Sequence, residues 1–272
     1  MIINPYASLE DFKSHTTPRG QTVVVDVLDD RLVSDILDEA ARQVDSECHR
    51  TFYPRYETRW FDVPVYQNSP RTLFLDDDLL EAVKVTNGDT NEVLPAVYNL
   101  KPKNYSPHYA IQIIGPTSIF WIFNGIGNIE KVISVEGWWG FHNRYGQRAW
   151  TVCGTLAAAI TTTTSLSFTL SAGHTLKADS IVKIDAEIMN ISATNLGGAT
   201  AIQRGDNGST AATHLISVPV YVWNVQPEIR LNTLQRAEKI YQERLGVTYG
   251  GNNAAKTKYE VNDITGFIKV IS

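Results

Sequence analysis

The residues that could carry chemistry are scattered along this chain of 272 residues. Its six histidines include no pair at the spacing H-x-x-x-H, and Cys48 and Cys153 are far apart. Zinc sites are usually built from closely spaced histidine and cysteine ligands. The sequence therefore predicts no metal site, and we expect the two thiols to be free and partly buried rather than joined in a disulfide.

Two groups of acidic residues come nearest to a site. Asp76-Asp77-Asp78, followed by Glu81, lacks the alternating ligands of an EF-hand, so we interpret this run as a solvated edge or a cap. Asp185 and Glu187 lie two residues apart and would share one face of a strand, as paired catalytic carboxylates can. The sequence indicates no nucleophile, base or groove beside them. We therefore expect no enzyme and no cofactor.

Two glycine-containing motifs are interpreted as turns. Arg204-Gly205-Asp206 spells the integrin-binding tripeptide, but three letters occur easily by chance. Gly205 and Asp206-Asn207-Gly208 are residue types that tolerate the positive φ angles of turns. Asn124-Gly125-Ile126-Gly127 lacks the third glycine of the dinucleotide-binding fingerprint, so it also predicts a turn.

The charge of the chain bears on its partners. The formal net charge is -5 and the isoelectric point is about 5.7. Free DNA-binding proteins usually carry a basic surface, because phosphate contacts supply most of their non-specific affinity. An acidic surface instead suits a channel through which DNA passes without being held. The chain shows no signal peptide and no apolar stretch of membrane-spanning length, so we expect it in a cytoplasm or in a particle assembled there.

Apolar spacing near four predicts three helices. A short helix begins after Ser8, which can cap it, with Asp11 near its positive end. A long helix is predicted over residues 27–49. A late helix is predicted over residues 227–245, with Gly246 placed to end it. The polar face of the long helix is mainly acidic, and its candidate residues for lining a DNA channel are Asp29, Asp30, Asp35, Asp38 and Glu39.

After residue 54 the apolar period changes from near four to two, which predicts strands. Short turns between the segments favour an antiparallel sheet, which we expect to dock on the long helix. Residues 151–222 contain few charges and more strand-like runs, typical of a small barrel or sandwich. The fold class predicted is α+β, with a core of residues 1–150 and 223–272 and an inserted all-β module at 151–222. The strand-like segments are 57–63, 72–75, 79–87, 94–100, 109–114, 132–138, 166–170, 181–184, 187–193 and 201–203.

The last residues form an apolar run that follows a flexible glycine-rich and asparagine-rich break at 250–255. Such a segment normally pairs with a sheet edge of its own chain or with a neighbouring subunit. We therefore predict a docking arm at residues 263–272. Its candidate contact residues are Ile264, Phe267, Ile268, Val270 and Ile271.

Several stretches together resemble the head–tail connector (adaptor) proteins of long-tailed double-stranded DNA phages. The order of the stretches carries the resemblance, which covers roughly residues 1–150 and 225–250. Within the β-module, residues 186–191, 203–214 and 218–220 are similar to short β-modules of phage virion proteins. The adaptor-like stretches are Tyr6–Phe12, the helix end Ala40–Pro54, Arg71–Leu80, Tyr98–Pro102, Ile133–His142 and Leu231–Arg244.

The resemblance implies a structural virion protein that forms a ring, commonly of twelve copies, in the neck between head and tail. Its implied partners are other copies of itself, the portal protein, the next neck or tail-terminator protein and passing double-stranded DNA, with no membrane. A ring of about twelve such copies would carry a charge of about -60 and would repel a passing polyanion. The acidic helix face is the candidate channel lining, although an ordinary solvated face remains the alternative.

Two other functions stay open at this point. A tail or baseplate protein could use the β-module at 151–222 to contact a host surface, although that segment has few aromatic residues for stacking on sugars. A hydrolase would need a nucleophile with its base, or a metal site, and the sequence indicates neither.

Overall fold

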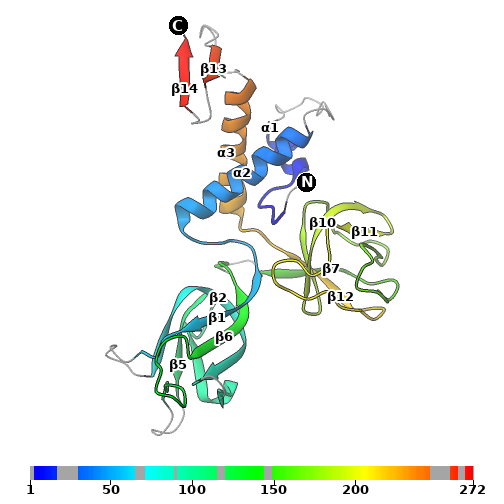
Figure 1. Ribbon diagram of the computed structural model, residues 1–272. Helices are drawn as coiled ribbons and strands as arrows, with labels where there is room; N and C mark the ends of the chain where they lie inside the picture. Colours follow the sequence, from blue (N-terminus) through cyan, green and yellow to red (C-terminus); the bar gives the residue numbers. More distant parts are fainter. Residues whose placement is uncertain are drawn as a thin grey trace. The chain divides into compact units, whose positions relative to one another are not determined.

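The computed structural model describes residues 3–16, 30–64, 71–88, 91–114, 120–143, 149–245, 258–262 and 267–271. The chain divides into two compact units, one of residues 1–46 with 227–272 and the other of residues 47–226. The described residues form three α-helices, two six-stranded antiparallel sheets and a two-stranded hairpin (Figure 1). The predicted α+β class is therefore confirmed. No described helix is long and apolar enough to cross a membrane.

The first unit is built on helices α1 (Leu9–Thr16), α2 (Asp30–Cys48) and α3 (Pro227–Leu245). The start of α1 is fixed as predicted: the amide of Asp11 donates to Ser8 Oγ at 3.0 Å, and the amide of Ser8 donates back to the Asp11 carboxylate at 3.1 Å. This reciprocal pair satisfies two amides that the first helical turn leaves without partners. The predicted bounds of α3 are confirmed at both ends.

Helices α1, α2 and α3 share one apolar cluster. Phe12 of α1 packs edge-on against Tyr241 of α3, with ring centroids 5.7 Å apart. The stripe predicted for the long helix is buried over 33–44, while residues 27–29 at its predicted start lie outside the described residues. Burial of this stripe removes apolar surface from water and so stabilises the packing of the three helices. The cluster contains Ala7, Phe12, Val33, Ile36, Leu37, Ala40, Leu234 and Ala237.

The described end of the chain is a hairpin. Strand β13 (Lys258–Asn262) pairs with β14 (Phe267–Ile271) in antiparallel register, with Tyr259 opposite Val270. The apolar run therefore finds backbone partners within its own chain, which is one of the two partners expected from the sequence. Among the described residues β13 and β14 pair only with each other.

The first large sheet belongs to the second unit and has the strand order β1-β6-β2-β5-β4, with β3 paired to β2. Segments 72–75 and 79–87, predicted as separate strands, are one strand with a bulge. The expected docking of this sheet on the long helix stays a prediction. The bounds are β1 (Arg55–Phe61), β2 (Thr72–Asn87), β3 (Asn91–Glu92), β4 (Tyr98–Lys101), β5 (His108–Ile113) and β6 (Ile133–Trp139), with the short 3-10 helix η2 at Pro95–Val97.

The second large sheet has the order β7-β12-β9-β10-β11-β8. Its two outer strands are joined by an isolated bridge between Leu156 and Leu170 and not by a ladder, so no barrel is closed within this fully described stretch. All six strands lie between residues 150 and 223, and the existence of a separable inserted module stays a prediction. The bounds are β7 (Trp150–Thr155), β8 (Ser167–Thr169), β9 (Ile181–Ile184), β10 (Glu187–Asn195), β11 (Gly198–Ala201) and β12 (Pro219–Trp223).

The two large sheets meet within the second unit. Trp223 Nε1 donates to the carbonyl of Phe52 at 3.0 Å. The turn Asn207–Gly208 exchanges hydrogen bonds with the start of β1 and the residue before it: the amide of Tyr56 donates to Asn207 O at 2.7 Å, and Asn207 Nδ2 donates to the Pro54 carbonyl at 3.0 Å. A shared apolar cluster, which includes Leu80, Trp138, Ile188 and Trp223, surrounds this junction.

Candidate functional site

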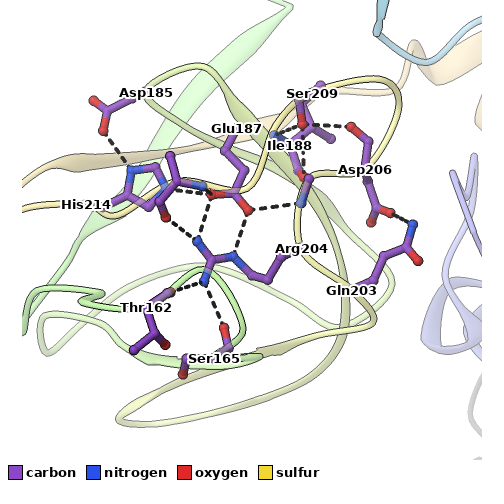
Figure 2. A network of polar contacts seen from close by, with 12 residues as sticks. Thr162, Ser165, Asp185, Glu187, Ile188, Gln203, Arg204, Asp206, Ser209 and His214 are labelled. Carbon is purple, nitrogen blue, oxygen red and sulfur yellow. Dashed lines mark hydrogen bonds and ion pairs between the residues drawn. The ribbon is translucent and has the colours of Figure 1, made fainter.

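A buried polar network centred on Glu187 lies at the start of β10 (Figure 2). The side chain of Glu187 is fully buried, yet its two carboxylate oxygens accept five hydrogen bonds. Arg204 donates two of them, at 2.7 and 2.8 Å, in a bidentate pair. The others come from His214 and from the amides of Gly205 and Ala212. These bonds replace the water that the carboxylate loses on burial.

Arg204 is also satisfied by partners on every side. Besides the pair with Glu187, its guanidinium donates to the carbonyl oxygens of Thr162 at 3.0 Å, Ser165 at 2.9 Å and Ala212 at 2.6 Å. An arginine has five N–H groups in a planar fork, and all five are used here. Arg204 thereby ties the loop after β11 to the segment before β8.

His214 lies between two carboxylates. Its Nδ1 is 2.8 Å from Asp185 Oδ2, and its Nε2 is 2.8 Å from Glu187 Oε2. Only the doubly protonated ring can donate to both. Asp185 reaches this position from the two-residue turn between β9 and β10, where its φ is +52°. The carboxylates of Asp185 and Glu187, considered in the sequence as a catalytic pair, are therefore joined through a histidine.

The pKa values of the buried groups follow from this geometry. Burial alone would lower the pKa of His214, but its hydrogen bonds to Glu187 and Asp185 and their negative charges raise it above its ordinary value. Burial alone would raise the pKa of Glu187, but hydrogen bonds from His214, Arg204 and the Ala212 amide lower it to about 2. The two cations, Arg204 and His214, are then balanced by the buried carboxylate of Glu187 and by the exposed carboxylate of Asp185.

A second group of polar contacts extends the network along β10. Asp206 is buried and accepts from the amide of Asn190 at 2.9 Å, from Asn190 Nδ2 at 3.0 Å and from Gln203 Nε2. Ser209 Oγ accepts from the amide of Ile188 at 2.8 Å. Loop 203–214 is therefore fixed to β10 at both ends. The turn interpretation of Arg204-Gly205-Asp206 is confirmed at Gly205, with φ +69°.

The buried polar atoms of this network are occupied by partners within the chain. The oxygens of Glu187 and both ring nitrogens of His214 already have partners, and His214 is only 1% exposed. A general base needs an open lone pair within reach of a substrate proton. Arg204 is 4% exposed, so its guanidinium is not presented to a receptor. The geometry instead fixes the position of a loop.

The network shapes a surface hollow of about 270 Å³ beside it. Ile160 and Phe168 are its buried lining residues, while Ala158 and Ala159 are exposed on its rim. Arg204 holds the carbonyl oxygens of Thr162 and Ser165, both of which line the hollow. His214 and Ile160 exchange backbone hydrogen bonds at 2.9 Å, which fixes the other end. No side chain that lines the hollow is charged.

The candidate channel residues of α2 lie on its polar side. Asp35 and Glu39 are exposed, and Asp38 is half-buried. Some of this face is paired, since Asp30 lies 2.5 Å from Lys13 and Glu39 lies 3.0 Å from Arg244. Asp29 lies outside the described residues. The role of these residues as a channel lining stays a prediction.

The candidate docking residues lie largely in the terminal hairpin. Phe267, Ile268, Val270 and Ile271 belong to β14, and Ile264 lies outside the described residues. The backbone register places Val270 opposite Tyr259 and Ile268 opposite Val261. Docking through these residues stays a prediction.

The acidic run of β2 has a structural use that its sequence did not indicate. Asp77 accepts from Arg55 at 2.7 Å and from Arg59 at 2.8 Å, and Asp76 lies 3.0 Å from Arg59. The run therefore lies in a central strand and pairs with arginines of β1, in place of the solvated edge or cap that we expected. No group of side chains among the described residues is arranged to hold a metal ion.

The two cysteines are free thiols in different surroundings. Cys48 is exposed at the end of α2. Cys153 is buried, its Sγ lies 3.3 Å from the Val220 carbonyl, and burial raises its pKa to about 11. A thiol with so high a pKa is a poor nucleophile at neutral pH, so Cys153 acts as a core residue.

Sequence reasoning considered Asp185 with Glu187 as a carboxylate pair, but it did not connect them with Arg204. His214 was considered only as one of six scattered histidines and as the end of a resembling stretch. A signal was present, because residues 186–191 and 203–214, two of the three stretches that resemble virion β-modules, contain Glu187, Arg204 and His214. A scan of protein-family models finds no match to the chain, and a search of curated protein sequences finds none either.

Proposed function

We propose that this chain is a structural virion protein: a head–tail adaptor that forms a ring under the portal, extends the DNA channel and docks the next neck or tail component. In this proposal the chain performs no catalysis. The acidic face of α2 lines the channel, and the terminal hairpin, with residues 263–272, is the docking arm. The observation that carries the proposal is that stretches resembling adaptor proteins, far apart in the chain, contact one another.

In the helical unit, three of these stretches meet. Tyr6 Oη lies 2.5 Å from Asp45 Oδ1, which joins the first stretch to the end of the long helix. Arg42 lies over the Tyr6 ring, with its Cζ 5.3 Å from the centroid. Phe12 contacts Tyr241, which joins the first stretch to the late helix. A chance resemblance would have no reason to select segments that pack together.

In the second unit, two further stretches are neighbours. Residues 71–80 and 133–142 contribute to β2 and β6, which pair from Leu79 opposite Trp139 to Asn87 opposite Ile133, so the two stretches meet at Leu79. Glu136 of β6 accepts a hydrogen bond from Tyr56 at 2.5 Å. The resembling stretches therefore include adjacent strands of one sheet, which is what a shared core requires.

A tail or baseplate protein is the second candidate. The observation that favours it is the segment of the second sheet that contains β7 and β8, since the chain carries no Asp, Glu, Lys or Arg between Trp150 and Leu176. Such a surface suits contact with another macromolecule. Binding of the whole chain to host cells, with no binding to portal rings, would select this function.

Attachment to portal rings tests the adaptor function. The full chain and a chain truncated after residue 262 are mixed with purified portal protein of the same phage, and the complexes are separated by size. We expect the full chain to co-elute with portal rings and the truncated chain to elute alone. A full-length control with Phe267→Ser and Ile268→Ser keeps the chain length and should also fail to attach. Equal attachment by the truncated chain would refute the docking arm, and failure of the full chain to attach would refute the adaptor.

A further inference from the structure

The loop between β5 and β6 exposes apolar side chains to solvent. Phe123 is 59% exposed and Ile126 is 90% exposed, and Phe120 and Ile122 are also exposed. Single exposed apolar residues are ordinary on protein surfaces, but a group of four in seven residues marks a contact surface. We define this surface as the apolar loop, residues 120–128.

The apolar loop is held in one conformation. Asn124 Oδ1 accepts from the amides of Ile126 at 3.2 Å and Asn128 at 2.8 Å, which closes the tip. Asn87 of β2 clamps the base, because its Nδ2 donates to the Phe120 carbonyl at 2.8 Å and its Oδ1 accepts from the Ile122 amide at 2.9 Å. A loop that is already ordered loses little conformational entropy when it binds.

The surface hollow beside the Glu187 network fits such a loop. Its lining is Ile160 and Phe168 with methyl and hydroxyl groups, and its volume of about 270 Å³ exceeds that of several water molecules, at about 30 Å³ each in the liquid. The hollow is also fixed in position, because Arg204 and His214 hold its rim. It can therefore accept an apolar side chain without rearranging.

Charge favours a second copy of this chain as the source of that side chain. Each copy carries a net charge of -5, so two copies repel one another over most of their surfaces. The chain has no Asp, Glu, Lys or Arg from Gly115 to Ile129 or from Trp150 to Leu176, which are the segments that contain the apolar loop and the hollow. Contact between these two surfaces brings no like charges together.

We propose that the apolar loop of one copy inserts Phe123 and Ile126 into the surface hollow at residues 158–169 of a second copy. The two surfaces differ, so the contact is heterologous and repeats from copy to copy, as the contacts of a ring do. This proposal rests on the ring of the proposed function and supplies one subunit contact within it. The buried network then serves assembly by fixing the receiving surface.

The test uses the full chain with one surface changed at a time. The loop variant carries Phe123→Glu and Ile126→Glu, and the hollow variant carries Ala159→Glu. All three positions are exposed, so both variants should fold. A matched control carries Leu196→Glu, which changes a residue that is 96% exposed at the turn between β10 and β11. Light scattering during size-exclusion chromatography measures the mass of each protein.

We expect the wild type and the Leu196→Glu control to run as multiples of the 30.3 kDa chain, and each of the other variants to run as a monomer. An equimolar mixture of the loop and hollow variants should form a species of two chains, because one intact loop still meets one intact hollow. A mixture that stays monomeric, or single variants that assemble as the wild type does, would overturn the contact. Assembly of both variants would leave the adaptor proposal standing, since portal attachment is measured separately.

A lipid surface is the competing occupant of the apolar loop. Wild type that is monomeric and floats with phosphatidylcholine vesicles, while the loop variant does not float, would overturn the proposed contact between copies.

Discussion

Arg204 and Glu187 form a bidentate ion pair inside the second sheet, with N–O distances of 2.7 and 2.8 Å and with both side chains at most 4% exposed. The pair joins the loop after β11 to the first residue of β10. With His214 it fixes both ends of the surface hollow. The free-energy cost of burying a charge of either sign is offset only by its partners. The first two predictions follow from this.

Removing the charge of Glu187 should destabilise the second unit strongly. Glu187→Gln leaves Arg204 and His214 buried without their shared carboxylate, which we expect to cost about 3–5 kcal/mol. Unfolding is followed by tryptophan fluorescence, because all six tryptophans lie between residues 60 and 223, within the second unit. Asp76→Asn is the control: Asp76 is 64% exposed beside Arg59, and its loss should cost about 0–1 kcal/mol. Equal losses in the two variants would contradict the burial argument.

The free energy of unfolding of the second unit should fall at both high and low pH. The pKa of His214 is raised, so its contribution is complete below its unfolded value of 6.5 and is lost as the pH rises through the folded pKa. The pKa of Glu187 is lowered to about 2, so its contribution is complete above its unfolded value of 4.5 and is lost as the pH falls towards 2. We therefore expect the network to contribute most between about pH 4.5 and 6.5.

Denaturant midpoints check this window, measured in steps of about one pH unit from about pH 3 to about pH 9. His214→Gln should remove the decline on the alkaline side and leave the decline on the acid side. The charged groups that face His214 are Asp185, Glu187 and, through Glu187, Arg204. An alkaline decline that persists unchanged in His214→Gln would assign it to another group.

The junction between the two large sheets should depend on Gly208. A Cβ at Gly208 would collide with the Tyr56 carbonyl, and φ is +81°. Gly173 has φ +82° but open space around a Cβ, so it is a matched control. Gly173→Ala should lose about 1–2 kcal/mol from backbone strain alone. Gly208→Ala should lose about 1–3 kcal/mol more from overpacking, measured by the same fluorescence. Identical losses in the free energy of unfolding would mean that the junction adjusts to the added methyl group without cost.

Reversing the charge of the acidic face of α2 should create DNA binding. A ring with Asp35→Lys and Glu39→Lys would present a positive channel, and phosphate contacts would retain linear double-stranded DNA at low salt. Glu92→Lys in β3 with Glu130→Lys in the loop before β6 makes the same change of charge at exposed positions away from α2. We expect retention, measured by filter binding, only in the first variant. Equal retention in both would indicate an ordinary solvated helix face.

Much of the helical structure could be predicted from the sequence because its signals are local. The apolar period over 33–44 and the Ser8–Asp11 cap each depend on residues that are only a few positions apart in the sequence. The split of β2 into two predicted strands has a physical cause. Asp76-Asp77-Asp78 interrupts the alternation, and these charges are paired in mid-strand with arginines from another part of the chain, Arg50, Arg55 and Arg59.

The network could not be predicted for the same reason. Glu187 is 17 residues from Arg204 and 27 from His214, and no local period connects them. Their meeting depends on loop 203–214 folding back over β10, which Asp206 and Ser209 enforce through backbone amides. Strands β7 and β12 were not named among the strand-like runs, since Thr and Gly in the first and Pro in the second also suit turns.

Electron microscopy of the particle neck tests the central claim most directly. In a reconstruction averaged with cyclic symmetry, we expect a ring of this chain directly beneath the portal. The acidic face of α2 should point towards the channel, and the apolar loop of each copy should contact the surface hollow of the next. A neck without this chain, or its presence as single copies at the host-contacting tip of the tail, would contradict the account.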